Sequence, residues 1–379
     1  MLDAMRRAAF ALPLLAGLLA APARADLVYV LNSGDAFITV LDSTTREEVR
    51  RIPVLREVHH LLLTPDRTEL VIGDSVANEL IFLDPATAEV TRRERISNPY
   101  HLEYSPDGRH LVITSLRRDQ VDIYDAATRT LQARLRVPDK PSHLAFSPDG
   151  RLVYVTLQGA RRLMAIDLAQ GRPVWTAEVG RQPAGVIWHR GRLLVGIMGA
   201  DHIAVVDPLD GKVERTIPVG RGAHTVFAAP DGRALYATSR VDSRLTVLDP
   251  ETLEVRARWD LPGGPDCIAF DPEGRLWVTL RWVARVAVVD PATGAAETIP
   301  VGRSPHGIFV QPRREPLPPV PVAATTPTDA APPVAEVTAA PVSPPPLAAA
   351  PLDASPVVPA ATPAPEPGQA PWWRRSLGR

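Results

Sequence analysis

The chain has 379 residues, a formal net charge of −1 and a single cysteine. A near-neutral charge gives no general case for nucleic-acid binding, and one cysteine excludes a disulfide framework. Stability must therefore come from the burial of apolar surface.

The first 25 residues are typical of a secretory signal peptide. Arg6 and Arg7 precede an apolar run, and Ala23 and Ala25 provide the small residues that a signal peptidase requires. We expect cleavage after Ala25 and a periplasmic mature protein. Since neither this run nor any later segment has the roughly 20 apolar residues needed to cross a bilayer, we predict no transmembrane segment.

Residues 26–314 repeat themselves at an interval of about 40 residues. Each unit holds an apolar run such as LVYV at 27 or LVIT at 111, a run that closes on aspartate, a more polar run, and a second apolar run. The second apolar run ends in a Pro-Asp-Gly corner in HLEYSPDG at 101, HLAFSPDG at 143 and TVFAAPDG at 225, and in the similar corner of CIAFDPEG at 267, whereas the blade from 183 has HRG at 189 instead. We expect each closing aspartate to accept backbone N–H groups of the following turn, and each corner glycine to be left-handed. The closing residues are Asp42, Asp84, Asp125, Asp167, Asp207, Asp249 and Asp290.

Seven units of four short strands predict an all-β, seven-bladed β-propeller with four-stranded antiparallel blades. The stretch HLAFSPDGRLVYVT at 143 resembles the YVTN-repeat family, which is similar to WD-repeat propellers. The resemblance implies that the run before each Pro-Asp-Gly corner is the innermost strand of its blade. Since residues 306–312 form such a run, we predict that the N- and C-terminal strands close one shared blade.

Two segments follow the predicted propeller. Residues 315–371 contain 18 of the 41 prolines and no Lys or Arg, which is typical of a disordered Pro/Ala-rich linker. Residues 372–379 form a Trp/Arg tip that could contact a membrane surface or a partner. We expect the protein to be a monomer.

Histidines recur at one place in the repeat. The direction of the chain brings the start of every innermost strand to one end of the propeller, together with the loops after the adjacent strands. The sixth and fifth residues before each corner hold six of the nine histidines, and Cys267 occupies the same position. Because a neutral imidazole offers a nitrogen lone pair, we predict a metal site, for copper, zinc or a haem-like tetrapyrrole. The candidate ligands are His59, His60, His101, His143, His224, His306 and Cys267.

Arginines gather in the loops at the same end, whereas the opposite end collects the acidic corner turns. Guanidinium groups bind carboxylates and phosphates in a bidentate manner, so this basic mouth is expected to hold the anionic groups of a cofactor or a protein or anionic partner. The residues assigned to this role are Arg181, Arg221, Arg240, Arg281 and Arg303.

Two propellers offer analogies for such a site. That of nitrous oxide reductase surrounds copper with histidines, and that of the haem-type nitrite reductases holds a tetrapyrrole with histidine and arginine. The chain shows neither a cupredoxin-like domain nor a CxxCH haem-attachment motif. Our first hypothesis is therefore a non-enzymatic binding or scaffold protein whose mouth holds a metal, a metal-containing cofactor or an anionic ligand.

Two alternatives remain open. The basic mouth could be an interaction platform for protein, cell wall or single-stranded nucleic acid. The chain could also be a metal-assisted lactonase or hydrolase, which ranks last because the sequence contains no nucleophile elbow.

Overall fold

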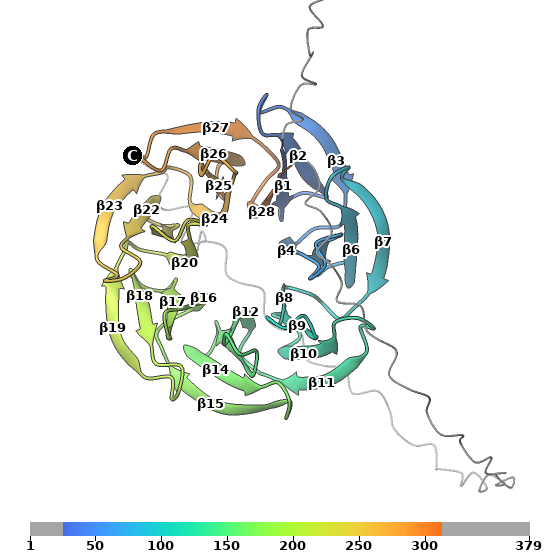
Figure 1. Ribbon diagram of the computed structural model, residues 1–379, viewed down its shortest axis with the longest axis vertical. Helices are drawn as coiled ribbons and strands as arrows, with labels where there is room; N and C mark the ends of the chain where they lie inside the picture. Colours follow the sequence, from blue (N-terminus) through green and yellow to red (C-terminus); the bar gives the residue numbers. More distant parts are fainter. Residues whose placement is uncertain (1–25, 313–379) are drawn as a thin grey trace, which may run out of the picture. The chain divides into compact units, whose positions relative to one another are not determined.

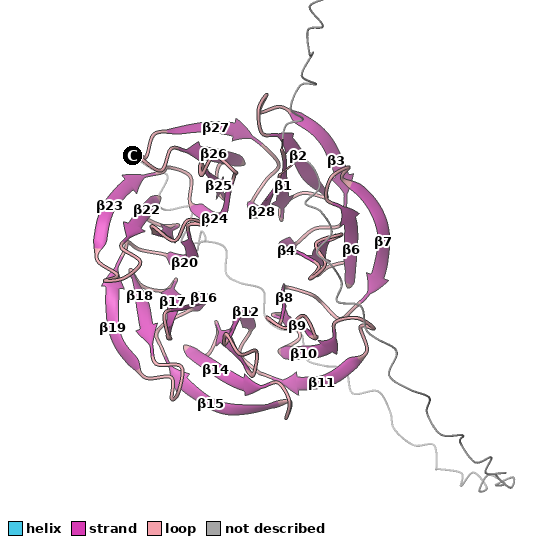
Figure 2. Cartoon of the chain, in the orientation of Figure 1, coloured by secondary structure: helices cyan, strands magenta, loops and turns pink. Residues whose placement is uncertain are grey.

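The computed structural model describes residues 26–312, which form 28 strands in seven four-stranded sheets. Figure 1 shows the sheets as blades around a common centre, and Figure 2 shows that loops alone connect the strands. The predicted all-β seven-bladed propeller is confirmed. The expected signal peptide (1–25), linker (315–371) and tip (372–379) lie outside the described residues. No helix within residues 26–312 is long and apolar enough to cross a membrane.

The innermost strand of each blade faces the centre of the ring, and the second strand pairs with it on the outer side. The innermost strands are β4 (Val58–Leu63), β8 (His101–Tyr104), β12 (Pro141–Phe146), β16 (Pro183–His189), β20 (Ala223–Ala228), β24 (Pro265–Phe270) and β28 (Pro305–Gln311). The second strands are β5 (Leu70–Asp74), β9 (His110–Ser115), β13 (Leu152–Leu157), β17 (Arg192–Ile197), β21 (Leu235–Ser239), β25 (Leu276–Leu280) and β1 (Leu27–Asn32).

The third and outermost strands complete the blades. The third strands are β6 (Glu79–Asp84), β10 (Gln120–Asp125), β14 (Arg162–Asp167), β18 (His202–Val206), β22 (Arg244–Leu248), β26 (Arg285–Val289) and β2 (Phe37–Asp42). The outermost strands are β7 (Glu89–Arg95), β11 (Leu131–Arg136), β15 (Arg172–Glu178), β19 (Val213–Pro218), β23 (Val255–Asp260), β27 (Ala296–Pro300) and β3 (Glu48–Pro53).

One blade joins the two ends of the described chain. Strand β28 pairs antiparallel with β1, so that the last strand becomes the innermost strand of the blade that contains β1, β2 and β3. The predicted closure is confirmed. The ring is thereby closed by hydrogen bonds between strands from the two ends of the described chain.

The hydrophobic core is divided into seven clusters, each between two neighbouring blades. In one of them, Tyr29 and Ile38 pack with Leu70 and Ile81 of the next blade. Every sheet therefore buries both faces, which explains why all six residues of β1 are buried although a strand with one solvent face would alternate.

The turns are built as the sequence predicts. Asp84 Oδ1 accepts the backbone N–H groups of Ala86 at 2.8 Å and Thr87 at 3.1 Å, and Asp249 Oδ1 accepts those of Glu251 at 2.7 Å and Thr252 at 2.8 Å. The corner glycines have φ angles of 69° to 83°, a left-handed conformation that glycine adopts without strain. These are Gly108, Gly150, Gly232 and Gly274.

The turn aspartates should make stability depend on pH. Backbone N–H groups and Arg256 lower the pKa of Asp249 to about 2. Because the folded pKa is lowered, its stabilisation is present above the unfolded value of about 3.9 and is lost as the pH falls towards 2. Asp249→Asn should therefore lower the free energy of unfolding at pH 6, with a deficit that narrows between pH 5 and pH 2, as measured by urea denaturation.

The exposed Asp260 lies outside these turns and provides a control. Asp260→Asn should change the free energy of unfolding little across the same range. A deficit of Asp249→Asn that stays constant down to pH 2 would contradict the electrostatic explanation.

Candidate metal site in the propeller mouth

Strand pairing confirms which loops share an end of the ring. Val58, the first residue of β4, pairs with Asp74, the last residue of β5, and Pro305 at the start of β28 pairs with Asn32 at the end of β1. We call this end, formed by the loops before the innermost strands and after the second strands, the mouth.

A β-bulge explains how two consecutive residues serve the same site. Val58 and Leu61 pair with Asp74 and Ile72, which leaves one extra residue on β4 within the interval of His59 and His60. Register shifts interrupt the same ladder in five further blades. A bulge redirects side chains and suspends the strict alternation of a strand. The intervals hold His59-His60, Ser142-His143, Ala184-Gly185, His224-Thr225, Asp266-Cys267 and His306-Gly307.

A threonine of the second strand holds several of these bulges. Thr279 Oγ1 accepts the backbone N–H of Cys267 at 2.9 Å and donates to the carbonyl oxygen of His306 in the next blade at 2.9 Å. Thr156 joins His143 and Ala184 in the same way. Each threonine thus fixes the spacing of two neighbouring innermost strands at the mouth.

Replacing this threonine should loosen the site. Thr279→Val keeps the shape of the side chain but leaves the Cys267 N–H and a His306 acceptor without that partner, so we expect a loss of about 1–3 kcal/mol in the free energy of unfolding. Denaturant titration measures it. Thr298→Val, on the exposed outermost strand β27, is the control and should cost less; equal losses would contradict the assigned role.

The six predicted histidines form one cluster. The His60 ring centroid lies 4.2 Å from that of His101, 5.0 Å from that of His143 and 4.9 Å from that of His306. His59 lies 5.1 Å from His306, and His224 lies 5.3 Å from His143. Six side chains from five blades therefore meet at the mouth.

Burial keeps the imidazoles neutral. It lowers the pKa of His59, His60 and His143 well below the ordinary value, and nearby histidines add to the effect. Burial followed by Arg240 lowers the pKa of His224 to about 4, and burial followed by His306 lowers that of His101 to about 3. Uncharged rings with available lone pairs are what metal coordination requires.

His60, His143 and His306 each keep a ring nitrogen that has no partner outside the histidine cluster among the described residues. Ring nitrogens of His60, His143 and His306 lie within 4.8 Å of one another. His306 Nδ1 is bonded to Asp266 Oδ2 at 2.6 Å, which leaves its Nε2 facing His60 Nε2 at 3.4 Å. His143 Nδ1 is bonded to Ser142 Oγ at 2.8 Å, and its buried Nε2 has no partner among the described residues.

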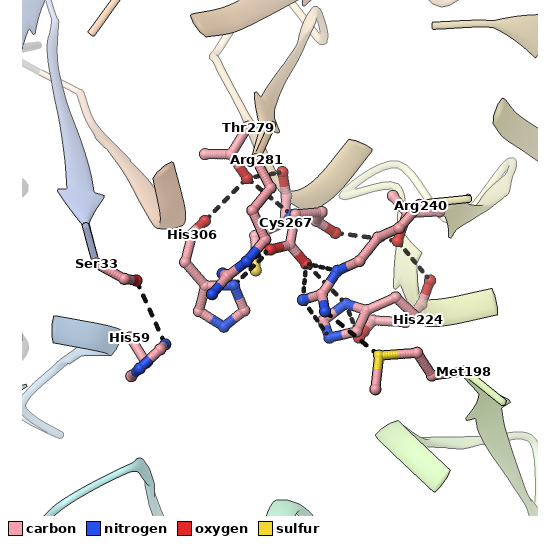
Figure 3. A network of polar contacts seen from close by, with 12 residues as sticks. Ser33, His59, Met198, His224, Arg240, Cys267, Thr279, Arg281 and His306 are labelled. Carbon is pink, nitrogen blue, oxygen red and sulfur yellow. Dashed lines mark hydrogen bonds and ion pairs between the residues drawn. The ribbon is translucent and has the colours of Figure 1, made fainter. Parts of the chain in front are cut away.

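Of the other three histidines, His224 uses both ring nitrogens within the protein, and His101 and His59 each use Nδ1. His224 Nδ1 lies 2.9 Å from Asp266, and its Nε2 accepts a hydrogen bond from Arg240 Nη2 at 2.8 Å. His101 Nδ1 accepts the backbone N–H of Leu144 at 3.1 Å, which leaves the proton of the neutral ring on Nε2. His59 Nδ1 lies 3.4 Å from Ser33 Oγ. Figure 3 marks this contact with a dashed line.

Asp266 connects the histidines to two arginines. Its carboxylate is fully buried and contacts His224, His306, Arg240 and Arg281. Although burial acts to raise it, Arg240 and then the two histidines hold the pKa of Asp266 well below its ordinary value. Figure 3 shows the side chains of Arg240, Arg281, His224 and His306 gathered in one polar network. The carboxylate therefore fixes the tautomers of His224 and His306.

Cys267 lies beside this network. Its sulfur, an Asp266 oxygen and a His306 nitrogen lie within 4.8 Å of one another. Burial, followed by the negative charge of Asp266, raises the pKa of the thiol well above its ordinary value. The side chain is thus a protonated thiol at neutral pH, whereas metal ligands need the thiolate.

The predicted arginines divide into two groups. Arg240 and Arg281 join the histidine cluster through Asp266. Arg181, Arg221 and Arg303 lie in loops before the innermost strands, which we call the rim of the mouth. Arg181 bonds the Gly199 carbonyl, Arg221 bonds Asp242, and Arg303 bonds Asp35.

The rim is consequently less basic than the sequence suggests. Acidic rim residues also neutralise Arg117, which pairs with Glu57, and Arg161, which pairs with Glu178. Sequence reasoning counted the arginines of the mouth loops and missed their partners.

Sequence reasoning also gave no role to Asp266 and overlooked Met198, whose sulfur accepts a hydrogen bond from Arg240 Nη1 at 3.4 Å. Met198 could have been found from its position in the repeat. The first residue after each second strand is Ser33, Ser75, Leu116, Gln158, Met198, Arg240 or Arg281. Several of these residues reach the cluster, so the position marks a second ring of candidate contacts.

The seven four-stranded blades, built from a repeat of about 40 residues, define the chain as a repeat protein with a seven-bladed β-propeller fold. A family model of YNCE-like β-propellers matches residues 2–314, and the chain belongs to that family. This agrees with the YVTN-repeat resemblance. No curated protein matches the sequence at a significant level.

Solved structures share the fold at low sequence identity. Hydrazine synthase of Kuenenia stuttgartiensis is 21% identical, over 68% of this chain and 90% of that chain, with a TM-score of 0.58. Dihydro-heme d1 dehydrogenase NirN in complex with DHE is 18% identical, over 76% and 75%, with a TM-score of 0.58. A putative 6-phosphogluconolactonase from Bacteroides fragilis is 14% identical, over 76% and 98%, with a TM-score of 0.60. At these identities the likeness extends to the fold alone.

Proposed function

We propose that this chain is an exported, periplasmic, non-enzymatic propeller protein that binds one transition-metal ion at its mouth through His60, His143 and His306. The signal-peptide features of residues 1–25 support export. The arrangement of the three rings supports the metal.

The observation that carries the proposal is a set of neutral ring nitrogens with few protein partners, on the buried His143 and His306 and the half-buried His60. Two nitrogens bound to a tetrahedral ion at 2.0–2.1 Å lie about 3.3 Å apart. His60 Nε2 and His306 Nε2 are 3.4 Å apart, and the unpartnered Nε2 of His143 belongs to the same group of residues. A buried polar atom without a partner is costly unless a ligand satisfies it.

A single ion fits this cluster better than a tetrapyrrole. The centroids of the rings around His60 lie 4.2–5.0 Å away, so the histidines contact one another and leave no slot for a macrocycle between them. Three neutral imidazoles suit zinc or copper, and copper(II) should bind more tightly under the Irving–Williams order. Three protein ligands also leave one coordination position open.

Removal of the ligands should abolish stoichiometric metal binding. We expect the natively purified protein to contain, or after metal removal to take up, about one equivalent of copper or zinc. The double variant His60→Ala with His306→Ala should lose this equivalent, because two of the three ligands are absent. Elemental analysis and titration with each metal measure the stoichiometry.

His110→Ala and His202→Ala are the matched controls. His110 bonds Gln132 and His202 lies beside Asp201, away from the cluster. Both variants should keep the metal. Wild-type protein that binds neither copper nor zinc would defeat the proposal.

Asp266 should act as a positioning residue for the metal. Its bond to His306 Nδ1 holds the proton there and directs the Nε2 lone pair towards His60. Loss of such a partner lowers metal affinity by roughly 10–100-fold. Asp266→Asn should therefore weaken zinc binding by this factor without abolishing it, as measured by competition with a chromophoric chelator. Unchanged affinity in a variant with a native circular-dichroism spectrum would refute the role.

One observation favours a second function, docking of a protein at the mouth. Half of the large apolar side chains exposed on the described residues lie in mouth loops: Leu55, Val76, Val241, Trp282 and Val283. The affinity for a protein partner bound there would be the same with and without a metal chelator. The metal-assisted hydrolase stays a prediction, which a lactonase and esterase screen of the metal-loaded protein would check.

A further inference from the structure

The two arginines of the cluster use their donors differently. Arg240 directs both Nε and Nη2 at Asp266 Oδ1, at 2.9 and 2.5 Å. Arg281 reaches Asp266 only through Nη1, at 3.2 Å from Oδ2. Within residues 26–312, no acceptor lies on Nε or Nη2 of Arg281. The Nε and Nη2 groups of Arg240 are therefore occupied, and the same two groups of Arg281 are free.

The charges around Asp266 also do not balance, because two positive groups share one negative group. Asp266 carries one negative charge and contacts two guanidinium groups, while burial keeps the neighbouring histidines neutral. Rim arginines differ, since Arg221 has Asp242 and Arg303 has Asp35 as its own partner. One positive charge at the cluster thus lacks a protein anion.

The side chain that carries the free pair is partly exposed to solvent. The side chain of Arg281 keeps 22% of its surface exposed, whereas Asp266, to which it is bonded, has none. The anchored Nη1 limits the motion of the guanidinium, so its remaining edge is held in place. A preorganised planar donor pair matches the two oxygens of a carboxylate or phosphate group.

We propose that the free Nε and Nη2 edge of Arg281 binds a small oxyanion, a carboxylate or phosphate group, at the mouth beside the histidine cluster. The inference goes beyond the proposed function, because the contact of Arg281 with Asp266 does not require a metal. A small anion fits better than a polymer because the guanidinium is mostly buried and its acidic anchor is fully buried.

The test uses the full chain in its metal-free form, titrated with sodium acetate and, separately, with inorganic phosphate. Isothermal titration calorimetry, together with the ¹⁵N–¹H signal of the Arg281 Nε group, reports binding. We expect saturable binding of at least one of the two anions and a shift of that signal. Whichever anion binds distinguishes a carboxylate site from a phosphate site.

Arg281→Gln should weaken the binding at least tenfold, and Arg281→Lys, which keeps the charge without the planar fork, should weaken it less. Arg285→Gln is the matched control, since Arg285 lies on the same blade, is half-buried and bonds Thr298 instead of Asp266. It should bind the anion like the wild type. Equal affinity in Arg281→Gln and the wild type, or no saturable binding of either anion by the wild type, would overturn the inference.

Titration of the same metal-free protein with copper and with zinc separates the two proposals. Anion binding that survives in a protein unable to bind copper or zinc would refute only the metal site. Metal binding retained by a wild type that binds neither anion would refute only the Arg281 site.

Discussion

A four-stranded blade has two apolar faces and can bury both only between two neighbours, and the whole structure depends on this constraint. Seven blades in a closed ring satisfy it, with one core cluster at every interface. Since the blades repeat one topology, the innermost strands all start at the same end of the ring. A residue type repeated at that position is therefore concentrated in space, and the histidines follow this rule.

Packing alone would not bring consecutive residues to one place. The bulges at the heads of the innermost strands do so, and threonines such as Thr279 hold the bulges across neighbouring blades. The same arrangement buries the imidazoles and lowers their pKa values, so that the chemistry of the mouth follows from its backbone geometry.

One buried carboxylate organises the charges of the mouth. Asp266 is kept ionised by Arg240 and by the histidines, and in return it sets the tautomers of His224 and His306 and anchors two guanidinium groups. The metal proposal and the anion proposal both start from this residue but use different atoms. The metal proposal uses ring nitrogens of His60, His143 and His306. The anion proposal uses the edge of Arg281 that Asp266 leaves free.

The sequence by itself determined the number of blades, the strand order, the closing strand and the end of the ring at which the histidines gather. These follow from apolar periodicity, turn residues and chain direction, which are local properties repeated along the chain. Only the tertiary structure decided which histidines keep a free nitrogen, that Arg181, Arg221 and Arg303 bond rim partners, and that Asp266 joins Arg240 and Arg281 to the cluster. Those outcomes depend on contacts between side chains far apart in the chain, such as His60 and His306, whose distances no local pattern encodes.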